Sequence, residues 1–134
     1  MKNLINKIKN LISLSTEAEK YIYSIAEEKS FSKGEVLIQE GQTVNKTFFV
    51  IHGSLRSFCV DKEGREHTLQ FAIQDWWISD FIAMYNHEPA SLTVECITDS
   101  TVIEFNAQKL AQIYLQFPEF EPFQRKTLER HVVS

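Results

Sequence analysis

The sequence has few of the residues that mark disulfide scaffolds, redox proteins and membrane proteins. Its 134 residues include only two cysteines, Cys59 and Cys96, and their separation excludes a CxxC motif. Each lies in an apolar, strand-like segment, so we interpret both as buried reduced thiols of a cytoplasmic protein. No apolar run is long enough to cross a bilayer. A signal peptide needs an unbroken apolar region, and Lys7 and Lys9 interrupt the N-terminal segment. We expect no membrane partner.

The sequence also lacks a cluster of charges of one sign. The chain carries 14 Lys and Arg against 18 Asp and Glu, for a formal net charge of −4, and no block of like charges occurs. Nucleic-acid-binding domains usually present a basic patch or stripe. We therefore expect contact with DNA only through a domain that these 134 residues do not contain.

Groups that could carry a reaction are sparse. The four histidines form no HxH pair, which a cupin-type metal site would need, and no GxSxG motif is present. Asp75, Asp80 and Glu88 lie close together in the sequence, as is common in an acidic chain. We predict no catalytic residue, no metal site and no enzymatic activity, with a cupin-like enzyme as the least favoured alternative.

Hydrophobic periodicity predicts helices on either side of a β-rich region. Thr16 to Glu19 fits a capping box that opens a helix. The expected apolar face of this helix consists of Ala18, Tyr21, Ile22 and Ile25. Asn106 is the expected N-cap of a later helix that Pro118 ends. A last amphipathic segment follows from Glu119, as though the chain ended inside a helix.

From Phe31 the apolar period changes from helical to two residues, and turn signals become frequent. The pattern predicts about eight short strands, as in a β-sandwich or jelly roll. The clearest are residues 35–40, 47–51, 55–60, 67–71, 92–96 and 101–105. Residues 61–64, with the sequence DKEG, form the expected turn of a hairpin. Repeats and linkers are missing, so we expect one domain over residues 1–134.

The stretch of residues 76–95 is the expected ligand-binding region. It reads as an aromatic strand end, a short helix opened by Ser79 and Asp80, a loop broken at Pro89, and a strand that starts at Ser91. That order places helix N–H groups and a loop at the end of a sheet. Such groups can hold an anion or a sugar hydroxyl.

Three glycine-punctuated segments, residues 33–41, 48–56 and 61–72, carry a resemblance to a known family. They resemble the β-roll of the cyclic-nucleotide-binding domain of Crp/Fnr-family bacterial transcription regulators. The order of helices and strands over roughly residues 10–134 is similar too. Tight corners between short strands often need a positive φ, which glycine adopts at little cost. The resemblance implies a mainly β fold with flanking helices, a double-stranded β-helix or jelly-roll-like β-roll of the cyclic-nucleotide-binding type.

The resemblance also implies the function of a ligand-sensing, regulatory domain. In that family a long helix leaves the roll, pairs with its twofold mate and leads to a helix-turn-helix domain. A homodimer is therefore implied, and the DNA-binding domain is absent from this chain. A short coiled-coil seam fits the spacing of Phe120, Phe123, Thr127 and Arg130, although docking on the roll explains it equally well.

The implied site is a cassette with a Gly-Glu pair that opens a short helix and an Arg-Ser or Arg-Thr pair shortly after. Ser79 and Asp80 match the first pair, Ser91 matches the hydroxyl, and Phe81 and Ala90 complete the candidate cassette. The arginine position holds Pro89 or Ala90. A charge-assisted bond to phosphate contributes about 1.5–3 kcal/mol, so its loss weakens cyclic-nucleotide binding roughly tenfold to a hundredfold.

We therefore predict a small-molecule effector other than a cyclic nucleotide, or none, and keep cyclic AMP or GMP as an alternative ligand. Further pocket candidates are Arg56, Phe71 and Trp77; Arg56 or Arg65 could supply the missing cation. Because neighbouring strand residues face opposite sides, one of Trp76 and Trp77 is expected in the core and the other in the pocket, unless both are core.

Two readings of this region stay open. The Asp80 carboxylate suits a ribose hydroxyl and equally suits the positive end of its own helix. A different class of function is a stand-alone, degenerate interaction module whose pocket is filled by side chains such as Trp77 and Phe81.

Overall fold

The computed structural model describes residues 4–6, 9 and 14–118. Their elements follow one another along the chain as helix, eight strands with one short helix between the sixth and seventh, and a closing helix. They are α2 (Thr16–Ile25), β1 (Ala26–Phe31), β2 (Val36–Ile38), β3 (Lys46–His52), β4 (Leu55–Val60), β5 (Glu66–Ala72), β6 (Trp77–Ile78), α3 (Phe81–Asn86), β7 (Thr93–Cys96), β8 (Ser100–Asn106) and α4 (Ala107–Gln116).

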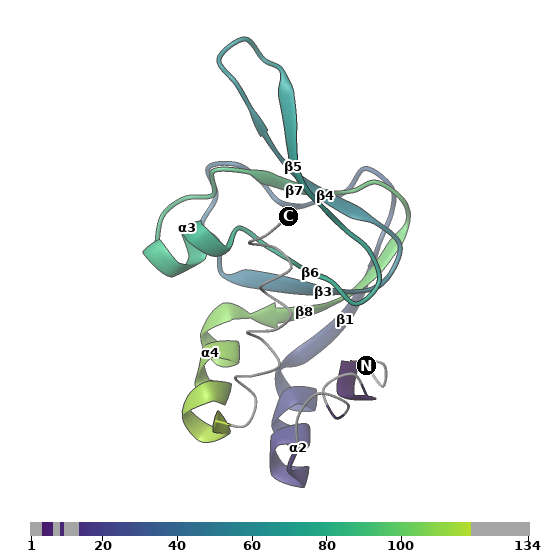
Figure 1. Ribbon diagram of the computed structural model, residues 1–134, viewed down its shortest axis with the longest axis vertical. Helices are drawn as coiled ribbons and strands as arrows, with labels where there is room; N and C mark the ends of the chain where they lie inside the picture. Colours follow the sequence, from purple (N-terminus) through teal and green to yellow (C-terminus); the bar gives the residue numbers. More distant parts are fainter. Residues whose placement is uncertain (1–3, 7–8, 10–13, 119–134) are drawn as a thin grey trace.

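The strands form two four-stranded antiparallel sheets. The first has the order β1-β8-β3-β6 and the second the order β2-β7-β4-β5. The sheets face each other as a roll, α2 and α4 lie beyond the first sheet, and the β4–β5 hairpin projects from the second (Figure 1). This arrangement confirms the predicted β-roll with flanking helices.

The first sheet is buried on both faces, which explains the unbroken apolar run in β3. Phe48 and Val50 pack in the roll interior, whereas Phe49 packs on the side of the helices. The neighbouring β6 divides in the same way, with Ile78 in the roll and Trp77 toward the helices. A strand covered on both faces needs apolar residues at consecutive positions. Sheet and helices therefore share one continuous hydrophobic support.

The two described helices of ten residues begin at polar caps. Asn106 caps α4 as predicted, because its side chain accepts hydrogen bonds from the N–H groups of Gln108 and Lys109. The predicted capping box at Thr16 is wrong by one residue. Ser15 is the N-cap of α2, and its hydroxyl accepts from the Ala18 N–H at 3.1 Å. The Glu19 carboxylate instead pairs with Lys9 at 3.0 Å.

Two predicted strand limits need correction. The two-residue period was expected from Phe31, but β1 begins at Ala26, directly after α2. The apolar pattern did not predict β1, because its sequence is rich in charged residues, which an edge strand tolerates. One of them, Lys29, pairs with the Glu104 carboxylate of β8 at 2.9 Å. The strand expected from Ser91 begins at Thr93. The predicted C-terminal seam lies outside the described residues.

All four glycines have positive φ angles, as the corner interpretation requires. Gly53, at φ +96°, makes the tight connection between β3 and β4. A Cβ atom there would collide with the Ser100 side chain and lie 2.6 Å from the Asp99 carbonyl oxygen. At Gly64, in the β4–β5 turn with φ +83°, a Cβ would meet nothing within 4 Å.

Gly53→Ala is expected to destabilise the fold more than Gly64→Ala. The second substitution adds only left-handed backbone strain, about 1 kcal/mol, while the first adds a backbone clash for a total of about 3 kcal/mol. Urea unfolding of both variants beside the parent chain measures the difference. Equal losses of unfolding free energy would contradict the close packing assigned to this corner.

Asp61 organises the β4–β5 turn. One carboxylate oxygen accepts from the N–H groups of Glu63 and Arg65, and the other lies 2.7 Å from His67 Nε2. The hydrogen bonds to His67 and to the backbone lower the pKa of Asp61. A carboxyl group whose pKa is lower in the folded state stabilises the fold above its unfolded pKa, about 3.9, and this contribution disappears as pH falls through the native pKa.

Asp61→Asn should therefore lower the free energy of unfolding at pH 7, with a difference from the parent that shrinks as pH falls below about 4. Urea unfolding at several pH values tests this. Glu63→Gln is the matched control, because the substitution keeps the Glu63 N–H that bonds Asp61 and removes only the charge that the side chain presents to Arg65 in an exposed ion pair. A pH-independent effect of Asp61→Asn would show that charge is not the cause.

Candidate functional site

The candidate cassette is held together by one buried carboxylate. Asp80, 3% exposed, is the N-cap of α3, and its Oδ1 accepts from the Ala83 N–H at 3.0 Å. Its Oδ2 accepts from both the N–H and the hydroxyl of Ser91, at 2.8 and 3.2 Å. The structure thus brings Asp80 and Ser91 together as predicted. We call this contact the Asp80–Ser91 clasp.

The loop between α3 and β7 is fixed at several further points. His87 adopts a left-handed conformation, φ 55°, and its N–H bonds the Ala83 carbonyl. Pro89 bridges to Thr43, and Ala90 exchanges backbone hydrogen bonds of 2.8 Å with Gln42 and Gly41. The backbone of the loop is therefore bonded to α3 and to residues 41–43 of the same chain.

The other predicted cassette residues serve the core. The Ser79 hydroxyl donates to the Lys46 carbonyl at 2.7 Å, which joins the start of α3 to β3. Ala90 is buried and belongs to the roll core, whereas Phe81 packs against the core on the helix side. Their chain positions match the implied cassette, but none of these three side chains presents a charge to a ligand.

Arg56 lies on the outer face of the second sheet. Its neighbours Leu55, Val94 and Cys96 point into the roll core, so Arg56 and its partner Glu95 point away from it. The guanidinium binds Glu95 at 2.7 Å and Glu66 at 2.9 Å, and it stacks 4.2 Å above the Phe58 ring. The hydrogen bonds to Glu66 and Glu95 raise the pKa of Arg56.

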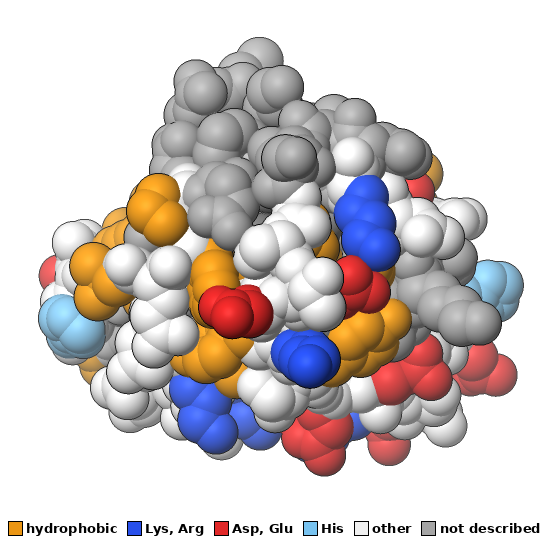
Figure 2. Space-filling model, turned by 90° about the horizontal axis from the view of Figure 1, so that it is seen from below, with side chains coloured by type: hydrophobic (Ala, Val, Ile, Leu, Met, Phe, Trp, Pro, Cys, Tyr) orange, Lys and Arg blue, Asp and Glu red, His pale blue; other side chains and the backbone are white. Residues whose placement is uncertain are grey.

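Neither arginine proposed as a substitute cation is free for the cassette. Arg56 already has two carboxylate partners, and Arg65 lies at the exposed β4–β5 turn, where it pairs with Glu63 at 3.3 Å. The charges on the described surface are otherwise interspersed. On the face shown in Figure 2, Lys and Arg alternate with Asp and Glu.

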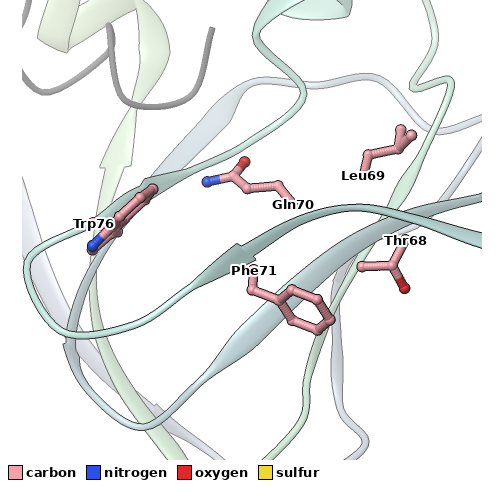
Figure 3. Close-up of a pocket in the computed structure, with 5 residues that line it drawn as sticks. All are labelled: Thr68, Leu69, Gln70, Phe71 and Trp76. Carbon is pink, nitrogen blue, oxygen red and sulfur yellow. The ribbon is translucent and has the colours of Figure 1, made fainter. Parts of the chain in front are cut away.

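A recess of about 280 Å³ opens at β5 and the turn that follows it. Its described lining consists of Thr68, Leu69, Gln70, Phe71 and Trp76. The Gln70 side chain extends toward the segment with Trp76, where its Nε2 donates to the Trp77 carbonyl at 3.1 Å, and the Phe71 ring projects from the other side of β5 (Figure 3). Phe71 is 61% exposed. We call this cavity the β5 recess.

The β5 recess reassigns the tryptophan pair. Trp77 was proposed for the pocket, but it is 1% exposed and packs edge-on against Phe49, with ring centroids 5.1 Å apart. Trp76 is the recess residue, and it comes four positions before Asp80. Trp77 therefore cannot fill a pocket within the roll. The alternation of strand faces predicted that the pair divides, but it did not say which residue takes which side.

Sequence reasoning also missed Gln70 and Glu95. Nothing in their local patterns marks them, since the first acts through a hydrogen bond between strands and the second through its register opposite Arg56.

Among the described residues no three His, Cys, Asp or Glu side chains form a group that could hold a metal ion. None of the described helices is long and apolar enough to cross a membrane.

Comparisons with known proteins place this geometry among related folds. The profile of a family described as cyclic nucleotide-binding domain matches residues 28–117. No curated protein sequence matches the chain.

Solved structures are similar in fold at low sequence identity. A cyclic nucleotide-binding domain from Methylobacillus flagellatus has a TM-score of 0.75 at 13% identity, over 96% of this chain and 73% of that one. The sensor domain of the transcriptional regulator DNR from Pseudomonas aeruginosa gives 0.71 at 16%, over 87% and 79%. The catabolite activator protein of Thermus thermophilus gives 0.73 at 15%, over 90% of this chain but only 56% of its own length.

Asp80→Ala should destabilise the domain by about 2–4 kcal/mol, because it leaves two N–H groups and one hydroxyl without their acceptor. Ser91→Ala removes only the hydroxyl bond and should cost about 1 kcal/mol. Urea unfolding gives both values, and amide hydrogen exchange should show faster opening of residues 87–91 in Asp80→Ala. Equal effects of the two substitutions would contradict a clasp centred on the carboxylate.

Proposed function

The chain belongs to the cyclic nucleotide-binding domain family, and from this premise we propose that it is the effector-sensing domain of a Crp/Fnr-type transcription regulator whose effector is uncharged. The observation that carries the proposal is the Asp80–Ser91 clasp. It consumes, within the protein, the N–H and hydroxyl of Ser91 that would otherwise be offered to an anion.

An anionic effector would meet two costs at the cassette. It would have to displace the Asp80 carboxylate from Ser91, or approach it and be repelled. It would also find no arginine or lysine between Arg65 and Lys109 to balance its charge. The lost charge-assisted bond alone is worth about 1.5–3 kcal/mol. Both costs disappear for an uncharged ligand.

The β5 recess suits such a ligand. Leu69, Phe71 and Trp76 supply apolar and aromatic surface, while Thr68 and Gln70 supply hydrogen-bonding groups. No charged side chain belongs to its described lining. A few polar groups on mainly apolar walls is the usual composition of a small-molecule site. At about 280 Å³ the recess is near the lower limit for such sites, so we infer a small effector.

Sensing would act through α3. An occupant of the β5 recess touches Trp76, and the chain runs from there through β6 directly into the clasp and α3. A ligand that favours one position of α3 over another shifts the population of the two. We propose that this shift changes the position of two subunits, and of DNA-binding domains attached to them, relative to each other. The regulator would act in the cytoplasm, and the ligand would undergo no reaction at the site.

A second candidate function follows from the same surface. Leu69, Phe71 and Ile73 are exposed at alternate positions, between 55% and 61%. Apolar side chains in a row on the surface often contact another protein. The alternative is therefore a degenerate domain that binds no effector and acts as a module for contact with another protein.

Titration with cyclic AMP and with adenosine separates an anion-binding cassette from an uncharged site. The two ligands share base and ribose and differ in the cyclic phosphate, so we expect cyclic AMP to bind no more tightly than adenosine. Isothermal calorimetry measures both affinities. Cyclic AMP that binds about tenfold or more tightly than adenosine would overturn the proposal, since phosphate would then contribute about 1.4 kcal/mol or more.

Tryptophan fluorescence locates the binding of any compound that saturates. Occupancy of the β5 recess should change the emission of Trp76, and Trp76→Phe should remove that change while the buried Trp77 still reports an intact fold. A change that persists in Trp76→Phe would place the ligand elsewhere.

A further inference from the structure

A second cavity lies outside the roll, between the short helix α3 and α4. It has a volume of about 310 Å³, and its described lining consists of Met84, Tyr85, His87, Ala107, Gln108, Leu110 and Ala111. In Figure 1 both helices lie on the same side of the molecule, and hydrophobic side chains gather along that side in Figure 2. We call this cavity the α3–α4 groove. The described linings of the groove and of the β5 recess share no residue.

The floor of the groove joins the two hydrophobic cores of the domain. Met84 packs against the core of the roll, whereas Leu110 belongs to the core on the helix side. Ala107 and Ala111, one turn apart on α4, have side chains too small to close the gap above this floor. Among the described residues, two alanines that face a short helix leave this volume open.

The described walls are mainly apolar, and their polar side chains have no partner among the described residues. Tyr85 is 66% exposed, and Ile82 beside it is 71% exposed. Within residues 14–118, no hydrogen bond or ion pair engages the side chains of Tyr85, His87 or Gln108. The described lining contains no Lys, Arg, Asp or Glu, in a chain of which 24% is charged.

We propose that the α3–α4 groove binds an uncharged, largely apolar small molecule that carries at least one hydrogen-bonding group. Apolar walls with a few polar groups at the rim match the composition of small-molecule sites, and the volume falls at the lower end of their range. Because no charged side chain belongs to the described lining, a charged ligand would lose its hydration there without compensation from these residues. This site is separate from the effector site and does not require the proposed function to be correct.

N-phenyl-1-naphthylamine is a suitable probe, because it is uncharged, aromatic, carries one N–H and fluoresces in apolar surroundings. Its fluorescence should rise and saturate with the parent domain. Ala111→Trp fills the groove from α4 and should weaken the probe at least about tenfold. Leu115→Trp is the matched control, since it adds the same side chain on the same helix at a position 84% exposed and outside the lining.

Phe71→Ala tests whether the probe enters the β5 recess instead, and it should leave the affinity within about twofold. Circular dichroism checks that each variant is folded. If Ala111→Trp does not fold, amide chemical shifts of the parent decide the question, and the changes should centre on Met84 to His87 and Ala107 to Ala111. The proposal is overturned if the probe does not saturate, if Ala111→Trp binds normally, or if Phe71→Ala abolishes binding.

Discussion

The Asp80 carboxylate is the interaction on which the geometry of the candidate site depends. It caps α3 through Ala83 and holds the following loop through Ser91, so both ends of a twelve-residue excursion from the sheet meet at one group. A buried carboxylate is stable only if hydrogen bonds replace its lost hydration. Three N–H and O–H donors do so here, and together they join the loop to the start of α3.

That solution has a chemical consequence. In a site that receives an anion, the loop donors stay available and a cation balances the incoming charge. In this chain the donors of Ser91 serve an internal anion, and Arg56 is held by Glu66 and Glu95 on the outer face of the sheet. The two features reinforce each other, because each would make an external phosphate more costly. The β5 recess, whose described lining carries no charge, imposes neither of these costs on an uncharged ligand.

The sequence was sufficient to predict features that local chemistry decides. Glycine marked the strand corners because only it adopts their positive φ cheaply, and Asn106 marked a helix start because its side chain can cap N–H groups. Features that depend on what covers a face could not be predicted. β1 was missed because an edge strand tolerates charges, and Trp77 was misplaced because the first sheet is covered on both sides. The orientation of Arg56 follows from strand pairing, which no short pattern contains.

The α3 helix is the element on which both cavities bear. At six residues it is too short to be stable alone, so its position depends on the clasp at its N-terminus, on buried Ala83 and on whatever lies beside it. The β5 recess adjoins the segment that enters α3, while the α3–α4 groove adjoins the outer side of α3. Ligands at the two sites would therefore be coupled through this helix. If both favour the same position of α3, each must raise the affinity of the other by the same factor, because linkage is reciprocal.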